Sequence, residues 1–187
     1  MIIREAIVLL LIMSLFSCSE ADEEKDSSVQ KVDPSLEVID SVYLYRIDST
    51  GLVYEVNSPQ MLIKYHNSYV TEEHPNGLSI VFYNRDAGES SITAGYSYTD
   101  KDFMTILKDD VRIVSDRGDV LETSFLKWDR RNRTIQTDKL VKLIQMSGDT
   151  SFGFGLQANE DFSRFRIKNG YAGKVQFEDL KQKLGLD

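Results

Sequence analysis

The chain has 187 residues, of which 30 are Asp or Glu and 22 are Lys or Arg, so its formal net charge is −8. This length suits one ordinary domain with a leader and a tether. An acidic chain gains nothing from neutralising phosphates, which excludes nucleic acid as an expected partner. The single cysteine, Cys18, excludes an intramolecular disulfide.

The first 17 residues have the layout of a secretory leader. Arg4 supplies a positive start, residues 6–16 form an uncharged apolar run, and the tetrapeptide LFSC ends at Cys18. The run is shorter than the roughly 20 residues that a transmembrane helix needs. LFSC resembles the lipobox of bacterial lipoproteins, in which the cysteine becomes the acylated N-terminus. We expect a signal peptide over residues 1–17 and a lipidated Cys18; the alternative is a buried free cysteine beside a hydrophobic N-terminal helix.

A polar, charge-rich stretch follows the cysteine. Residues 19–33 read SEADEEKDSSVQKVD, which is the composition of a solvated tether. We therefore assign residues 18–35 to the lipidated cysteine and an acidic flexible tether, and residues 36–177 to one domain. Residues 178–187 form a tail for which a helix is expected, since Phe177, Leu180 and Leu184 have helix-like spacing.

Strand signals dominate the chain from Val38 onward. Short runs of β-branched and aromatic residues occupy 42–47, 52–56 and 61–65, and Gly, Ser, Asn and Pro separate them. No apolar stripe with helical spacing appears before the C-terminal tail. These features indicate an all-β domain.

A weak internal repeat organises the second half of the chain. Gly88, Gly118 and Gly148 lie thirty residues apart, and an acidic residue follows each of them. Two apolar residues spaced two apart precede each glycine: Val81 and Tyr83, Val111 and Ile113, Val141 and Leu143. Such pairs face one side of a strand, and glycine permits the positive φ of a tight hairpin. The repeat predicts an antiparallel, jelly-roll-like β-sandwich of repeated hairpins.

Within residues 107–169 the motifs follow a definite order. A V-x-I strand and a Gly turn precede L-x-T-x-x-L-x-W-D, then I-x-T-D, a second strand of the first kind, and G-x-G-L. In this chain they are Val111, Ile113, Gly118, Leu121, Thr123, Leu126, Trp128, Asp129, Ile135, Thr137, Asp138, Val141, Leu143, Gly153, Gly155 and Leu156. This pattern resembles the LptC/OstA-like family of periplasmic lipopolysaccharide export proteins. Residues 42–98 match only in style.

The resemblance implies an open, OstA-like β-jelly roll with a hydrophobic groove for the acyl chains of lipopolysaccharide or lipooligosaccharide. Such a protein receives lipid from an inner-membrane ABC transporter complex, which consumes the ATP. It passes the lipid to a periplasmic bridging jelly-roll protein through an end-to-end strand junction. Many relatives carry a transmembrane helix, and a lipidated Cys18 would anchor this chain to the membrane in the same way. The family implies that the anchor lies at the periplasmic face of the inner membrane. The acidic stretch after Cys18 could equally be a sorting signal for the outer membrane, which is the alternative location.

Residue alternation suggests which side chains line the groove. The ten lipid-binding candidates are Val111, Ile113, Leu121, Leu126, Trp128, Ile135, Val141, Leu143, Leu156 and Phe165. The alternative is that they form a closed core. The last convincing strand supplies the expected partner edge, through Phe165, Arg166, Ile167 and Lys168.

Other reactive residues carry no comparable pattern. His66 and His74 lack the spacing of metal ligands, so we expect solvated loop histidines. The acid pairs Asp109–Asp110 and Glu160–Asp161 are expected at turns rather than as a glycosidase pair. The basic run Arg130–Arg133 is expected at a solvated hairpin tip, with contact to lipid phosphates as the alternative. No catalytic residue, metal or cofactor is therefore predicted.

Three functions remain beside the lipid carrier. An OstA-type bridge protein would share the fold, and an envelope lipoprotein scaffold would lack lipid cargo. An enzyme acting on envelope glycans is the most remote. The carrier predicts a groove, the scaffold a packed core, and the enzyme converging carboxylates.

Overall fold

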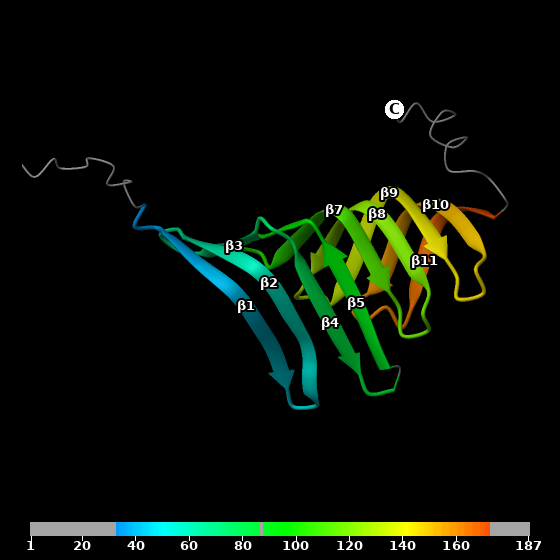
Figure 1. Ribbon diagram of the computed structural model, residues 1–187, viewed down its shortest axis with the longest axis horizontal. Helices are drawn as coiled ribbons and strands as arrows, with labels where there is room; N and C mark the ends of the chain where they lie inside the picture. Colours follow the sequence, from blue (N-terminus) through cyan, green and yellow to red (C-terminus); the bar gives the residue numbers. More distant parts are fainter. Residues whose placement is uncertain (1–32, 87, 173–187) are drawn as a thin grey trace, which may run out of the picture. The chain divides into compact units, whose positions relative to one another are not determined.

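The computed structural model describes residues 33–86 and 88–172, and this part of the chain is all-β. Its strands pair antiparallel into one continuous sheet, which confirms the expected fold class (Figure 1). The strands are β1 (Leu36–Asp48), β2 (Gly51–Tyr65), β3 (Val70–His74), β4 (Leu78–Asn84), β5 (Gly88–Ala94), β6 (Tyr96–Thr99), β7 (Met104–Val114), β8 (Val120–Asp129), β9 (Thr134–Ile144), β10 (Thr150–Asn159) and β11 (Phe165–Ala172). The predicted signal peptide, Cys18, the tether up to residue 32 and the predicted helical tail lie outside the described residues.

Long bent strands divide this sheet into two facing layers. One half of β2 pairs with β4 and the other half with β3. Likewise, β7 pairs with β5 beyond its bend and with β6 before it. Layer A therefore contains β4 and β5 between halves of β2 and β7, and layer B contains β3 and β6 between the other halves. The strands β8 to β11 extend both layers, which face each other as in a jelly roll.

The bends have local causes in the backbone. Asp109 and Asp110 adopt φ of 62° and 56° in the middle of β7, where the register with β8 shifts. Gly155, with φ of 81°, lies at the corresponding shift in β10. The expectation that Asp109–Asp110 form a turn is wrong, because two positive-φ residues bend a strand here without ending it. The runs predicted as separate strands at 52–56 and 61–65 are likewise parts of one continuous strand, β2.

The repeated glycines lie at hairpin tips, as the sequence predicts. Gly88, Gly118 and Gly148 all have positive φ, between 83° and 103°. The N–H groups of Gly118 and Gly148 donate to the carbonyls of Ser115 and Gln145 at 2.9 and 2.8 Å, so these two turns match. Glycine fits because an L side chain is strained at such φ.

The first repeat unit is offset by one residue. Its inward pair is Ile80 and Phe82, both 1% exposed, whereas the sequence favours Val81 and Tyr83. Phe82 lies six residues before Gly88, but Ile113 lies five before Gly118. Because successive side chains of a strand point to opposite faces, this one-residue difference moves the inward positions from Val81 and Tyr83 to Ile80 and Phe82.

The hairpin tips of both layers lie along one side of the domain, opposite the bends. Layer A contributes the turns β1–β2, β4–β5, β7–β8 and β9–β10, and layer B contributes β2–β3, β6–β7, β8–β9 and β10–β11. We call the line between these two sets of tips the seam. The seam is where the layers meet without a covalent connection.

Candidate functional site

The space between the layers holds one apolar cluster that includes the predicted lipid-binding residues. Eight of the ten are at most 2% exposed: Val111, Ile113, Leu121, Leu126, Trp128, Ile135, Val141 and Leu156. The other two, Leu143 and Phe165, are partly buried and pack against the cluster. The structure thus brings all ten together.

Cross-strand pairing arranges these side chains in rows along the domain. In layer A, Ile92, Ile113, Leu121 and Leu143 are successive register partners from β5 to β9. In layer B, Trp128, Ile135, Ala158 and Phe165 are successive partners from β8 to β11. Each row runs across the strands, so the apolar lining continues from one hairpin to the next and reaches β11.

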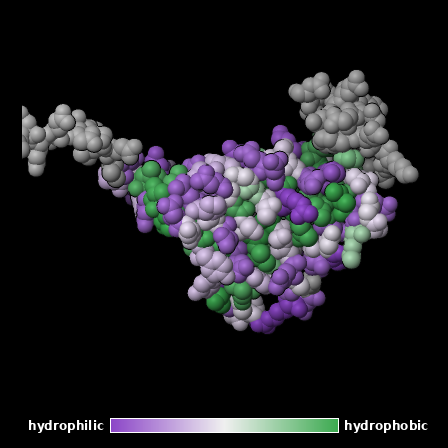
Figure 2. Space-filling model, viewed as in Figure 1, coloured by the Kyte–Doolittle hydropathy of each residue, from purple (hydrophilic) through white to green (hydrophobic). Residues whose placement is uncertain are grey.

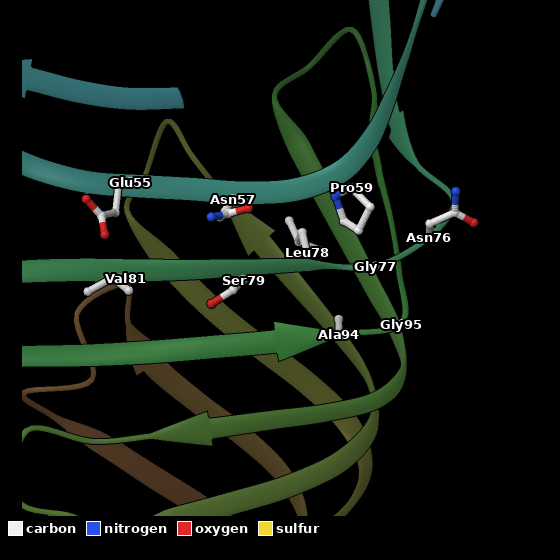
Figure 3. Close-up of a pocket in the computed structure, with 10 residues that line it drawn as sticks. All are labelled: Glu55, Asn57, Pro59, Asn76, Gly77, Leu78, Ser79, Val81, Ala94 and Gly95. Atoms are coloured by element: carbon white, nitrogen blue, oxygen red, sulfur yellow. The ribbon is translucent and has the colours of Figure 1, made fainter. Parts of the chain in front are cut away.

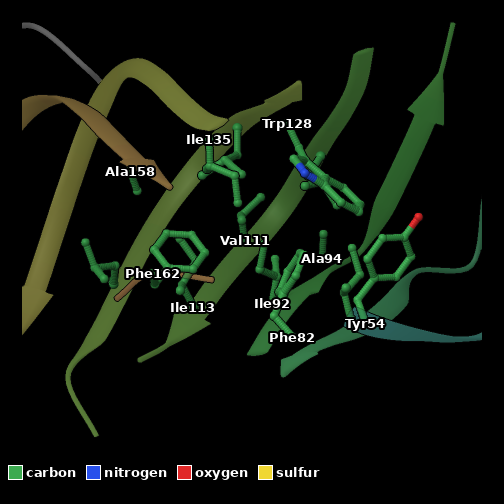
Figure 4. Packing of buried hydrophobic residues seen from close by; sticks show 14 of the residues in the cluster. Tyr54, Phe82, Ile92, Ala94, Val111, Ile113, Trp128, Ile135, Ala158 and Phe162 are labelled. Atoms are coloured by element: carbon green, nitrogen blue, oxygen red, sulfur yellow. The ribbon is translucent and has the colours of Figure 1, made fainter. Parts of the chain in front are cut away.

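An aromatic cluster fills the interior near β2 and β4. The ring of Trp128 lies 5.3 Å from that of Tyr54 and 5.2 Å from that of Phe82, both in edge-to-face geometry. Figure 4 shows these rings on one side of the cluster, facing each other from the two layers. Such contacts add to the burial energy and join layer A to layer B.

Beyond the aromatic cluster, the interior becomes polar toward β3 and β6. Arg130 donates to the Tyr54 hydroxyl at 3.0 Å and to Glu72 at 3.2 Å. Burial alone would lower the pKa of the Arg130 guanidinium, but Tyr54 and Glu72 outweigh burial and raise it. The expectation of a solvated basic tip is therefore wrong for Arg130, whose side chain turns inward beneath Trp128.

His74 belongs to the same polar region. It lies on β3, is 4% exposed, and its Nδ1 has no hydrogen-bond partner in the described part of the chain. Burial lowers its pKa. The expectation of a solvated loop fits His66, between β2 and β3, but is wrong for His74, because residues 70–74 form β3 and not a loop. Across 33–86 and 88–172, no three His, Cys, Asp or Glu side chains gather as metal ligands do.

A further buried residue, Phe162, was not predicted from the sequence. It lies in the β10–β11 turn, next to Asp161, yet it is fully buried in the apolar cluster. A phenylalanine between Asp161 and Ser163 looks like an isolated apolar residue in a polar turn. The acid pair Glu160–Asp161 does lie in this turn, as predicted.

The hollows of the surface lie at the margin of this interior or on its outer face, and the smallest of them reaches Val53 and Phe82 of the apolar cluster. Recesses of about 250 and 720 Å³ flank the seam, and Tyr83, Arg133 and Asp161 line both. A third, of about 490 Å³, lies on the outer face of β2 and β4, where Glu55, Asn57 and Ser79 lie beside apolar residues such as Pro59 and Val81 (Figure 3). None of them is an apolar slot between the layers.

Both ends of the described sheet are edge strands. Among the described residues, β1 pairs only with β2, and β11 pairs only with β10. The predicted partner edge, Phe165 to Lys168, is the first half of β11. Six large apolar side chains of β1 are exposed, namely Leu36, Val38, Tyr43, Leu44, Tyr45 and Ile47, and Figure 2 shows hydrophobic surface at this end. Such an edge can accept another strand.

The described residues contain no helix long and apolar enough to cross a membrane. In a comparison with curated proteins, none matches the chain. A family model described as "Lipopolysaccharide-assembly, LptC-related" matches residues 6–175, which is most of the sequence. This match agrees with the all-β jelly-roll-like fold and gives the chain a role in lipopolysaccharide transport at the cell envelope, together with the Lpt transport machinery. The chain belongs to the LptC family.

Proposed function

We propose that this chain is a membrane-anchored periplasmic carrier that takes lipopolysaccharide or lipooligosaccharide from an inner-membrane ABC transporter complex. It holds the acyl chains between layers A and B. It then passes the lipid to a periplasmic bridging jelly-roll protein joined to β11. A lipidated Cys18 keeps the domain at the periplasmic face of the inner membrane, and the outer membrane is the alternative location.

The observation that carries this proposal is the continuity of the apolar rows. One row runs from β5 to β9 in layer A and the other from β8 to β11 in layer B, so an acyl chain lying between them would meet apolar side chains from β5 to β11. Burying about a dozen CH₂ groups contributes on the order of 10 kcal/mol before ordering costs are subtracted. The inward side chains already fill the interior, so lipid binding requires the layers to separate.

Photocrosslinking in cells tests the carrier. A photoreactive phenylalanine analogue at Leu156, which points inward, is expected to form an adduct with lipopolysaccharide. The matched position is Gln157, the next residue of β10, which is exposed and points outward. Protease resistance of each variant checks the fold. Adducts from both positions, or from neither, would contradict a carrier with its site between the layers.

One observation favours the envelope scaffold as the second candidate. Leu107, Leu121, Leu126 and Leu156 are 0% exposed, which is the packing of a closed core. A scaffold predicts normal partner adducts from β11 without any lipid adduct from Leu156. The same experiment therefore separates the two functions.

A further inference from the structure

The β10–β11 turn connects the two layers across the seam. We call residues 159–164 the clasp loop. Asp161 accepts a hydrogen bond from the Asn84 side chain, and its backbone carbonyl accepts one from the Ser90 hydroxyl at 2.8 Å. Asn84 and Ser90 belong to β4 and β5 in layer A, whereas the clasp loop belongs to layer B. These bonds hold the tips of opposite layers together.

Phe162 inserts from the clasp loop into the apolar interior. Its side chain is 0% exposed and belongs to the same cluster as Val111 and Ile113 (Figure 4). Its φ is 53°, a left-handed conformation that a bulky side chain adopts only when its surroundings require it. The loop thus places an aromatic ring from the seam side among the side chains that the proposed function assigns to acyl chains.

The attachment of the clasp loop is polar and only partly buried, since Ser90 is 3% exposed while Asp161 is half-buried. The recesses of about 250 and 720 Å³ lie at the seam, and Asp161 lines both. Each hydrogen bond contributes only modest net stability, so a segment held across the seam by a few of them can open locally while the rest of the domain stays folded. Within the loop, Asn159 and Asp161 accept bonds from the backbone of Arg164 and Ser163, so it can move as one unit.

We propose that the clasp loop is a displaceable closure of the seam, and that Phe162 occupies the interior until an acyl chain replaces it. This inference rests on the proposed function and adds the route of lipid entry. The loop detaches from Asn84 and Ser90, the ring of Phe162 leaves, and an acyl chain enters sideways between the tips. After the lipid moves on, Phe162 returns and covers the apolar rows.

The single tryptophan offers a direct readout of this movement. The indole N–H of Trp128 donates to Glu160 of the clasp loop at 3.1 Å. The full chain is placed in polymer-bounded lipid discs, which contribute no tryptophan, and is mixed with lipooligosaccharide. Three quantities are followed: Trp128 fluorescence, amide exchange of residues 159–164, and adducts from a photoreactive residue at Leu156.

Two variants loosen the clasp loop in different ways. Asn84→Ala removes one bond across the seam, together with the bond that its side chain accepts from the Asp86 backbone in its own turn, and leaves the apolar cluster unchanged. Phe162→Ala removes the ring. Loss of the bond across the seam is expected to speed adduct formation roughly fivefold. The matched control is Asn132→Ala, because Asn132 lies at the neighbouring β8–β9 tip and bonds to Asp129 within its own loop. If Phe162→Ala fails to fold, Asn84→Ala still decides.

Faster adduct formation in Asn84→Ala but not in Asn132→Ala, with Trp128 fluorescence and loop exchange changing as lipid enters, supports the clasp. Wild-type rates in every variant, with the loop protected while adducts form, overturn the clasp and leave the carrier intact. Complete absence of lipid adducts from Leu156 in all variants overturns the proposed function, and the clasp with it.

Discussion

At the scale of single residues, His74 makes the stability of the domain depend on pH. Burial is the main cause of its lowered pKa and the nearby Arg130 adds to it, whereas Glu72 and a hydrogen bond that the imidazole donates to the Gln60 backbone carbonyl oppose it. The unfolded chain therefore takes up a proton near pH 6.5 that the folded chain does not. The free energy of unfolding should fall as the pH drops from about 7 to about 5, by up to about 1.4 kcal/mol per pH unit.

Urea unfolding at several pH values measures this dependence. In His74→Gln the free energy of unfolding should depend less on pH over the same window. The difference from wild type separates the contribution of His74 from that of the carboxylates. His66→Gln is the control, because it removes the same ring from the β2–β3 loop. A His66→Gln curve that flattened equally would refute the assignment to His74.

At the scale of single strands, the bends are what turn hairpins into a two-layered domain. Gly155 bends β10 at φ of 81°, where a Cβ atom would lie 3.1 Å from the flexible side chain of Lys168. Gly155→Ala should destabilise the domain by about 1–2 kcal/mol, mainly through the left-handed backbone. Gly155→Asn should cost less, since Asn tolerates this conformation. Equal losses in thermal unfolding would show that crowding against Lys168 dominates instead.

The strands were predictable where their signals are local. Alternating apolar residues and the glycines Gly118 and Gly148 specify strands and tips within a few residues, and the structure has both. The bend at Asp109–Asp110 could not be predicted, because two adjacent aspartates are typical of a turn. Only the pairing of β7 with β5, β6 and β8 keeps the strand continuous there. The burial of Phe162 and Arg130 was not predicted for a related reason, because only tertiary contacts turn these two side chains inward.

At the scale of the whole domain, its two edge strands differ in charge. β1 contains Glu37, Asp40 and Asp48 with one arginine, whereas β11 contains Arg166 and Lys168 and no acid. Opposite charges on approaching edges speed association and fix its direction. A first strand like β1, on a partner jelly roll, would therefore be attracted to β11, in keeping with transfer from this chain to a bridging protein.

Reversing the charge of β11 tests this direction of assembly. Arg166→Glu with Lys168→Glu should leave the fold intact, because both side chains are exposed, and should reduce in-cell photocrosslinking of Asn169 to the bridging protein severalfold. The control double variant is Lys127→Glu with Lys139→Glu, which makes the same charge change on the exposed faces of β8 and β9, away from the edge. An equal loss in both variants would mean that net charge, and not the β11 edge, governs the association. Loss only in the β11 variant, relieved by a partner carrying basic residues on its first strand, would assign β11 as the exit edge of the carrier.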